Sequence, residues 1–118
     1  MSRTIVLLVI ILGLAACGAP RKSEPLAGPP PLYSAALEQG RVLYDRHCHR
    51  CHASGEGGLG PGVTNVPAPK ALMRLQVRQG LGTMPGFSER EISDPELDQL
   101  LDYVLALRKL PAEGQASR

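Results

Sequence analysis

The chain has 118 residues and a formal net charge of +2, from 13 lysines and arginines against 11 aspartates and glutamates. This length accommodates one small domain and leaves no room for a large enzyme fold with its own substrate pocket. The basic residues form no run or stripe, which argues against nucleic acid as a partner. Only 3% of the residues are aromatic, and a domain so small and poor in rings needs a staple such as a metal, a disulfide or a cofactor.

Residues 1–16 are typical of a targeting segment. Arg3 supplies a positive start, an unbroken apolar run covers 5–12, and small residues precede Cys17. The run is shorter than the ~20 residues that a membrane-spanning helix needs. Leu14-Ala15-Ala16-Cys17 resembles the bacterial lipoprotein box, in which the cysteine is lipidated and becomes the mature N-terminus. The alternative is an ordinary signal peptide, whose removal leaves Cys17 as an unmodified thiol.

Residues 17–33 are predicted to form a linker. Prolines crowd this segment, at positions 20, 25, 29, 30 and 31, and each removes an amide donor and fixes φ. Such a composition favours extended polyproline geometry and predicts a semi-rigid stalk between a lipid anchor and the domain. A disordered leader without a spacing role is the alternative.

Helical spacing of apolar residues begins after the linker. Ser34 is a fair N-cap for the first predicted helix. Gly40 lies inside this helix and costs about 1 kcal/mol relative to alanine, which a close approach by another helix would explain. A second, short helix is expected over 71–79, bounded by Pro69 and Gly80.

The last predicted helix carries the clearest start signal. Ser93 and Glu96 match a capping box, and Pro95 falls in the first turn, where its missing donor is harmless. Apolar residues then recur on one face, at Leu97, Leu100, Leu101, Val104 and Leu105. Between the first two helices, glycines over 55–62 predict an irregular loop. The sequence contains no pattern of a strand ladder, so an all-α fold is predicted.

The decisive motif is Cys48-His49-Arg50-Cys51-His52. Two cysteines three positions apart at the end of a helix project to the same side. This spacing suits two thioether bonds from Cys48 and Cys51 to the vinyl groups of one haem. The histidine directly after the second cysteine, His52, can then reach the iron from one face. The motif is the C-x-x-C-H attachment signature of c-type haem.

Two other interpretations of this motif remain. A thioredoxin-like redox pair needs a βαβ surrounding, and no strand is predicted. A structural zinc site needs four ligands. Cys48, Cys51 and His52 supply three, with His47 or His49 as a cramped fourth.

A low-spin electron carrier needs a second axial ligand on the opposite face of the haem. Met84 lies within 80–87, a loop whose three glycines let the backbone approach a macrocycle closely. Met73 falls inside a predicted helix, where a thioether usually packs. His47 and His49 are too near the attachment motif to reach the other face, so a surface role is expected for both. Met84 is therefore the predicted partner of the proximal histidine.

Over roughly 34–110 the chain resembles a class I, mono-haem c-type cytochrome. The resemblance rests on the attachment motif, on Gly40 and Tyr44 before it, on Tyr103 in the last helix and on Met84-Pro85. It implies a small all-α cytochrome c fold, with three to four helices wrapped around one covalently bound haem c. It also implies that the first and last helices cross at the glycine and aromatic positions.

The resemblance assigns one further contact. In that family the proline carbonyl at the position of Pro61 accepts a hydrogen bond from the proximal histidine, here His52, which orients the imidazole and raises its basicity. Two departures are Ala53, where a glycine often follows the histidine, and the lack of tryptophan. The second leaves the partners of the haem propionates open, and the candidates on charge alone are basic residues of the short helix: Lys70, Arg74 and Arg78.

Ligation by two protein side chains leaves no coordination position for a substrate. The predicted function is therefore one-electron transfer, rather than enzyme catalysis, by a membrane-tethered carrier in a periplasmic or respiratory redox chain. Its partners are expected to be redox proteins and a membrane, without nucleic acid or a small-molecule substrate. The alternatives are the haem subunit of a larger oxidoreductase complex and a haem-based sensor.

The predicted organisation has four parts. Residues 1–16 are a lipoprotein-type signal peptide, 17–33 the lipidated Cys17 with its proline-rich linker, 34–110 the cytochrome c domain and 111–118 a flexible tail. The lipid would hold the protein on a membrane, facing the periplasm or the outside of a bacterial cell. The residue after the lipidated cysteine is Gly18 rather than an aspartate. In this position the chain resembles lipoproteins that are sorted outward.

Overall fold

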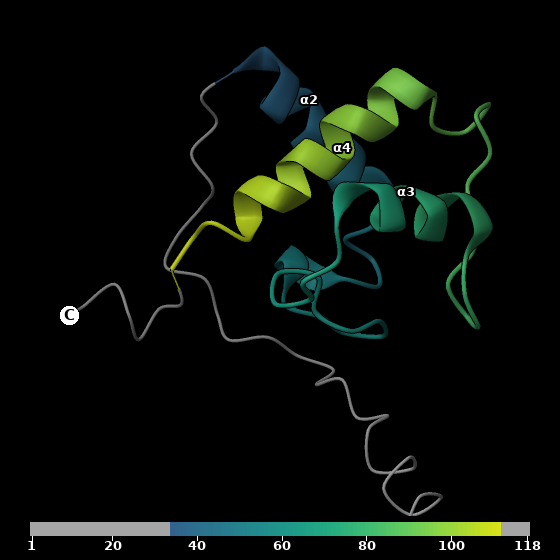
Figure 1. Ribbon diagram of the computed structural model, residues 1–118, viewed down its shortest axis with the longest axis horizontal. Helices are drawn as coiled ribbons and strands as arrows, with labels where there is room; N and C mark the ends of the chain where they lie inside the picture. The colour runs from purple at the N-terminus through teal and green to yellow at the C-terminus, as the bar shows by residue number, and fades with distance from the viewer. Residues whose placement is uncertain (1–33, 112–118) are drawn as a thin grey trace, which may run out of the picture.

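A computed structural model describes residues 34–111 of the chain (Figure 1). Its elements, in chain order, are α2 (Ala35–His47), the 3-10 turn η1 (Ala53–Gly55), α3 (Lys70–Gln79) and α4 (Asp94–Leu107). The described residues contain no strand, and an isolated bridge joins Leu81 to Met84. The predicted all-α class is therefore confirmed. The predicted signal peptide, linker and all but the first residue of the tail lie outside the described residues.

The helices start and stop where local chemistry predicts. The Ser34 hydroxyl accepts a hydrogen bond from the Leu37 amide at 3.2 Å, which caps α2. At α4, the Glu96 carboxylate accepts from both the amide and the hydroxyl of Ser93, at 2.8 and 2.7 Å. Helix α3 begins one residue earlier than predicted and ends at Gly80, whose φ of +70° stops it.

Helices α2 and α4 cross in close contact, as Figure 1 shows. A Cβ added at Gly40 would lie 2.2 Å from the Gln99 carbonyl oxygen and 3.0 Å from the Tyr103 Cβ. Four residues further along α2, the rings of Tyr44 and Tyr103 pack with their centroids 5.5 Å apart. This confirms that the helices cross at the glycine and aromatic positions.

The buried core lies mainly between these two helices. It contains Leu43, Tyr44, Val77, Ile92, Leu97, Leu100, Leu101, Tyr103, Val104 and Leu107. Helix α3 contributes Val77 alone to that set. No helix within 34–111 is long and apolar enough to cross a membrane.

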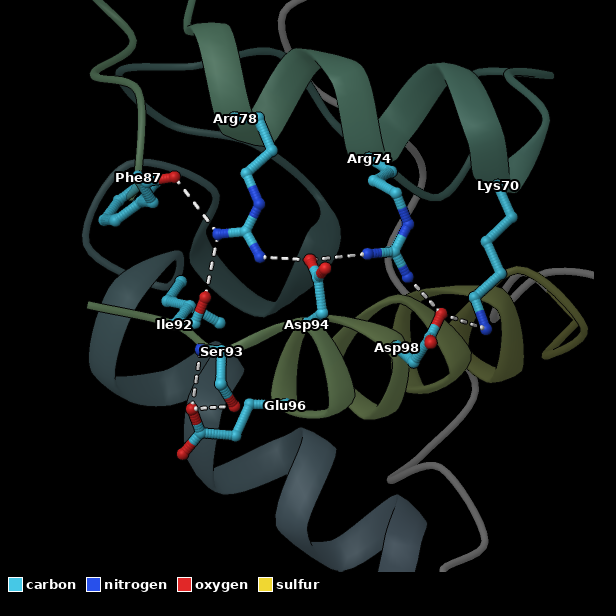
Figure 2. Close-up of polar contacts among 9 residues, drawn as sticks. All are labelled: Lys70, Arg74, Arg78, Phe87, Ile92, Ser93, Asp94, Glu96 and Asp98. Atoms are coloured by element: carbon cyan, nitrogen blue, oxygen red, sulfur yellow. Dashed lines mark hydrogen bonds and ion pairs between the residues drawn. The ribbon is translucent and has the colours of Figure 1, made fainter. Parts of the chain in front are cut away.

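Helix α3 is attached to α4 by a ladder of ion pairs (Figure 2). Basic residues recur every four positions on α3 and face acidic residues that recur every four positions on α4. The pairs are Lys70 with Asp98 and Asp102, Arg74 with Asp94 and Asp98, and Arg78 with Asp94. These carboxylates pair with the three cations that charge alone makes candidates for the propionates, and that assignment stays a prediction.

Candidate haem attachment site

The attachment motif forms a tight turn at the end of α2. Cys48 caps the helix, and its amide donates to the Tyr44 carbonyl at 2.8 Å. The Cys48 carbonyl in turn accepts from the amides of Cys51 and His52, at 3.1 and 2.8 Å. These bonds gather both cysteines and the histidine at one end of α2. Both thiols are free.

The attachment motif does not gather the ligands of a zinc site within 34–111. Burial, and to a smaller extent the neighbouring Cys51, raises the pKa of Cys48 to about 12. Burial thus disfavours the charged thiolate of Cys48 in the metal-free protein. Within 34–111, no three His, Cys, Asp or Glu side chains are grouped so that they could hold a metal ion.

The His52 ring is oriented by the glycine-rich loop. Its Nδ1 lies 2.8 Å from the Pro61 carbonyl oxygen. A carbonyl oxygen only accepts, so Nδ1 carries the proton and Nε2 keeps a free lone pair for a metal. A Cβ at Gly60 would lie 2.4 Å from the ring Cε1. Glycine at this position therefore lets the loop backbone pass beside the imidazole.

The main chain of His52 is also held. The Tyr44 hydroxyl donates to the His52 carbonyl oxygen at 2.5 Å, and the Gly55 amide donates to the same oxygen at 3.0 Å. Burial raises the pKa of Tyr44, so its hydroxyl stays a donor. Downstream, Ser54 adopts a φ of +53°, and its amide donates to Nδ1 of His49 at 3.2 Å. Helical spacing predicted packing for Tyr44 but carried no signal for its hydrogen bond.

The two candidate methionines differ in their surroundings. The Met73 sulfur accepts from the Arg108 guanidinium at 3.0 Å, and Arg108 also donates to the carbonyl oxygens of Val63 and Ala68. The Met84 sulfur accepts a longer hydrogen bond, of 3.7 Å, from the neutral side-chain amide of Gln76. Met73 is thus engaged between a helix end and a loop, while Met84 sits on the glycine-rich turn after α3. This difference favours Met84 as a ligand.

The loop around Met84 is closed by backbone contacts. The amide of Leu81 donates to the Met84 carbonyl at 3.1 Å, and the amide of Met84 returns a bond to Leu81 at 3.0 Å. A Cβ at Gly80 would lie 2.4 Å from the Met84 carbonyl oxygen. After the loop, Phe87 meets the edge of the His47 ring, with centroids 5.7 Å apart. The His47 side chain is half-buried and packs against Phe87, and the surface role expected for it stays a prediction.

The residues present fit a haem c by the chemistry of their donors. Two free thiols, an imidazole with a free Nε2 and a thioether on a glycine-rich loop are the donor set that such a group needs. Cys48 and Met84 both pack against the edge of the one core. Large apolar side chains are exposed in the loop after the attachment motif, on α3 and in the Met84 loop: Leu59, Val66, Leu72, Leu75 and Leu81. A macrocycle with apolar faces suits such surroundings.

Comparisons with known proteins agree with this donor set. Residues 35–104 match the family model described as cytochrome c oxidase, cbb3-type, subunit III. The chain is 35% identical over 68 residues to the cytochrome c subunit of 4-cresol dehydrogenase [hydroxylating] from Pseudomonas putida, covering 58% of this chain and 59% of that subunit. It is 32% identical to cytochrome c6 of Cyanidium caldarium, covering 64% of this chain and 74% of the relative. Cytochrome c6 of Cyanidioschyzon merolae is 29% identical, with 66% and 81% covered. No solved structure gives a significant match.

Proposed function

The chain belongs to the cytochrome c family whose model describes subunit III of cbb3-type cytochrome c oxidase, and we propose from this membership that it carries single electrons between redox proteins. Cytochromes of this family hold haem c covalently and transfer electrons rather than catalyse a reaction on a substrate. The observation that carries the proposal is the orientation of His52. Its Nδ1 is engaged with the Pro61 carbonyl, beside two free cysteines at the attachment spacing.

Each of the site residues has a separate task. Cys48 and Cys51 would hold the haem through two thioethers, and His52 would ligate through the Nε2 that its hydrogen bond leaves free. Met84 would ligate from the opposite face, with its position set by the closed Gly80–Phe87 loop. The bound haem supplies an iron that changes its oxidation state by one electron. Because protein side chains fill both axial positions, little of this chain needs to move on electron transfer.

The proposal places the domain on a membrane. Leu14-Ala15-Ala16-Cys17 supports lipidation at Cys17, and the prolines of 17–33 support a stalk that lets the domain reach its partners. A lipid-anchored carrier facing the periplasm or the outside of a bacterial cell would result. Mass spectrometry of the membrane fraction tests this placement, because a diacylglyceryl group at position 17 has a defined mass. An unmodified Cys17, or a chain cleaved elsewhere, would contradict it.

A second function is favoured by one relative. The P. putida protein is named as the cytochrome c subunit of a dehydrogenase, which supports a fixed subunit whose catalytic partner is another chain. The chain covers 59% of that subunit, so this assembly stays the second candidate. Size-exclusion chromatography of the protein extracted from its native host separates the two. A free carrier would elute as a monomer, whereas a subunit would elute with its oxidoreductase.

The central test uses protein expressed with haem-attachment machinery. We expect the red colour to stay with the polypeptide after boiling in denaturing detergent, because thioethers survive this treatment. The double variant Cys48→Ala/Cys51→Ala should lose it entirely. Arg50→Ala is the matched control, since it lies inside the motif without supplying a thiol. A wild-type haem that detergent extracts would refute the proposed function.

A further inference from the structure

Arg78 differs from the other two cations of the ladder. Its guanidinium donates to the Asp94 carboxylate at 2.7 Å and also to two main-chain carbonyls, of Ile92 at 2.8 Å and of Phe87 at 3.2 Å (Figure 2). The hydrogen bonds of Lys70 and Arg74 are to carboxylates of α4. The Arg78 side chain is also more buried, at 19% exposure against 34% and 31%. One side chain thus joins α3, the end of the Met84 loop and the start of α4.

These contacts lie at the base of the loop that carries Met84. The loop leaves α3 at Gly80, two residues after Arg78, and returns at Phe87, whose amide donates to the Val77 carbonyl at 2.8 Å. A Cβ at Gly86 would lie 2.7 Å from the Arg78 carbonyl oxygen. The main chain of Arg78 therefore lies close to Gly86, where the loop returns. The Arg78 side chain binds the carbonyl of Phe87, the residue after Gly86.

We propose that Arg78 is the positioning residue for Met84, holding the Phe87 end of the loop against α4 and so setting how firmly the thioether stays on the iron. This inference rests on the proposed function, in which Met84 is an axial ligand. Arg74 lies one turn earlier, with the same charge and shared carboxylates, but has no contact with the loop among the described residues. Rigidity of the loop, rather than the number of ion pairs on α3, is what Arg78 supplies.

The test compares Arg78→Lys with Arg74→Lys in the haem-loaded protein. Both substitutions keep the charge, but a single ammonium cannot bridge a carboxylate and two carbonyls as the planar fork does. Imidazole is titrated into the oxidised protein, and displacement of Met84 is followed by loss of the near-red charge-transfer band. We expect Arg78→Lys to lower the imidazole midpoint by about tenfold, as for loss of a hydrogen bond to a charged group. Arg74→Lys should leave the midpoint within about twofold.

A second pair approaches the same contact from α4, in case Arg78→Lys does not fold. Asp94 binds Arg78 and Arg74, whereas Asp98 binds Lys70 and Arg74. Asp94→Asn should therefore lower the imidazole midpoint more than Asp98→Asn does. Urea midpoints of all variants, measured on the same samples, separate ligand retention from general stability.

Equal shifts within either pair, or shifts that follow the urea midpoints, would overturn the role of Arg78. The same holds if no variant changes the imidazole midpoint. Failure of the proposed ligation is visible earlier and separately, because the wild-type protein would then lack the near-red band before any variant is compared. That result would remove the premise and the inference with it.

Discussion

The hydroxyl of Tyr44 donates a hydrogen bond to the carbonyl oxygen of His52 across a separation of 2.5 Å. The two residues lie eight positions apart, one inside α2 and the other at the end of the attachment motif. The His52 ring, in addition, is fixed to the Pro61 carbonyl. His52 is thus held by its main chain and by its ring at once.

Tyr44→Phe is expected to loosen this arrangement without removing the aromatic packing. A carbonyl acceptor on Nδ1–H raises the basicity of the imidazole and favours the oxidised iron, so a looser ring should move the reduction potential to more positive values. Stability should fall by about 1 kcal/mol through the lost hydrogen bond. The measurements are the reduction potential and, by NMR of the reduced protein, the exchange rate of the His52 Nδ1 proton.

Tyr103→Phe is the matched control for this change. Tyr103 packs against Tyr44 in the same pair but has no contact with His52 among the described residues. It should leave both the potential and the Nδ1 exchange rate unchanged. Equal effects from the two variants would mean that aromatic packing, rather than the Tyr44 hydroxyl, controls the histidine.

Local signals in the sequence predicted the helices well because their causes are local. Ser34, Ser93 with Glu96, and Gly80 act on residues within one turn of themselves, and each behaves in the structure as its side chain dictates. Gly40 could be interpreted as a close approach, because nothing within its own helix rewards a glycine there. The three expected helices follow from these few positions.

The contacts that organise the candidate site were harder to predict because they join distant segments. The Tyr44 hydroxyl meets the His52 carbonyl because the motif between them turns back on itself, with the Cys48 carbonyl accepting from the Cys51 and His52 amides. Pro61 could be named only through a resemblance, since irregular chain separates it from His52.

The ion-pair ladder, by contrast, was within reach of the sequence. Cations at 70, 74 and 78 and carboxylates at 94, 98 and 102 share a four-residue period, so two helices packed side by side would pair them. Considering α3 alone left its cations without partners and made them candidates for the propionates. Reading the charges of α3 and α4 together would have predicted the ladder.

Gly40→Ala tests the crossing of α2 and α4. In an isolated helix this change would stabilise by about 1 kcal/mol. Here the new methyl group would lie 2.2 Å from the Gln99 carbonyl oxygen, which belongs to the α4 backbone and cannot move aside cheaply. We expect the haem-loaded protein to lose about 1–3 kcal/mol of unfolding free energy in urea. A gain in stability would mean that the helices are further apart than the structure has them.

The start of α4 should be sensitive to acid. Hydrogen bonds from the hydroxyl and then the amide of Ser93 hold the pKa of Glu96 below its ordinary value. A lowered folded-state pKa stabilises the fold at any pH above the unfolded value of about 4.3, and this stabilisation is lost as the pH falls through the lower folded value. Glu96→Gln should therefore have a lower urea midpoint than wild type at pH 7, and the two proteins should converge in acid.

Glu89→Gln provides the comparison for that experiment. Glu89 is exposed and has no hydrogen-bond partner among the described residues, so its substitution should leave the urea midpoint close to wild type at every pH. If the Glu96→Gln difference persists unchanged in acid, the carboxylate contributes through its shape rather than through its charge.

Met84→Ala should abolish the near-red charge-transfer band of the oxidised protein and lower the reduction potential, because a thioether ligand favours reduced iron. It should also let carbon monoxide bind readily to the reduced protein, which wild type resists if both axial positions are filled. Absorption spectroscopy and a redox titration measure these effects. Fast carbon monoxide binding by the wild type would instead support the sensor alternative.

Met73→Ala is the control that separates the two methionines. The Met73 sulfur accepts from Arg108, which also holds the carbonyls of Val63 and Ala68. Its loss should cost about 1–3 kcal/mol of stability and keep the band. A band that survives Met84→Ala but disappears in Met73→Ala would reverse the assignment. The Arg108 contact with Met73 would then have to break when the haem binds, whereas its hydrogen bonds to Val63 and Ala68 come from other nitrogens of the guanidinium and would remain.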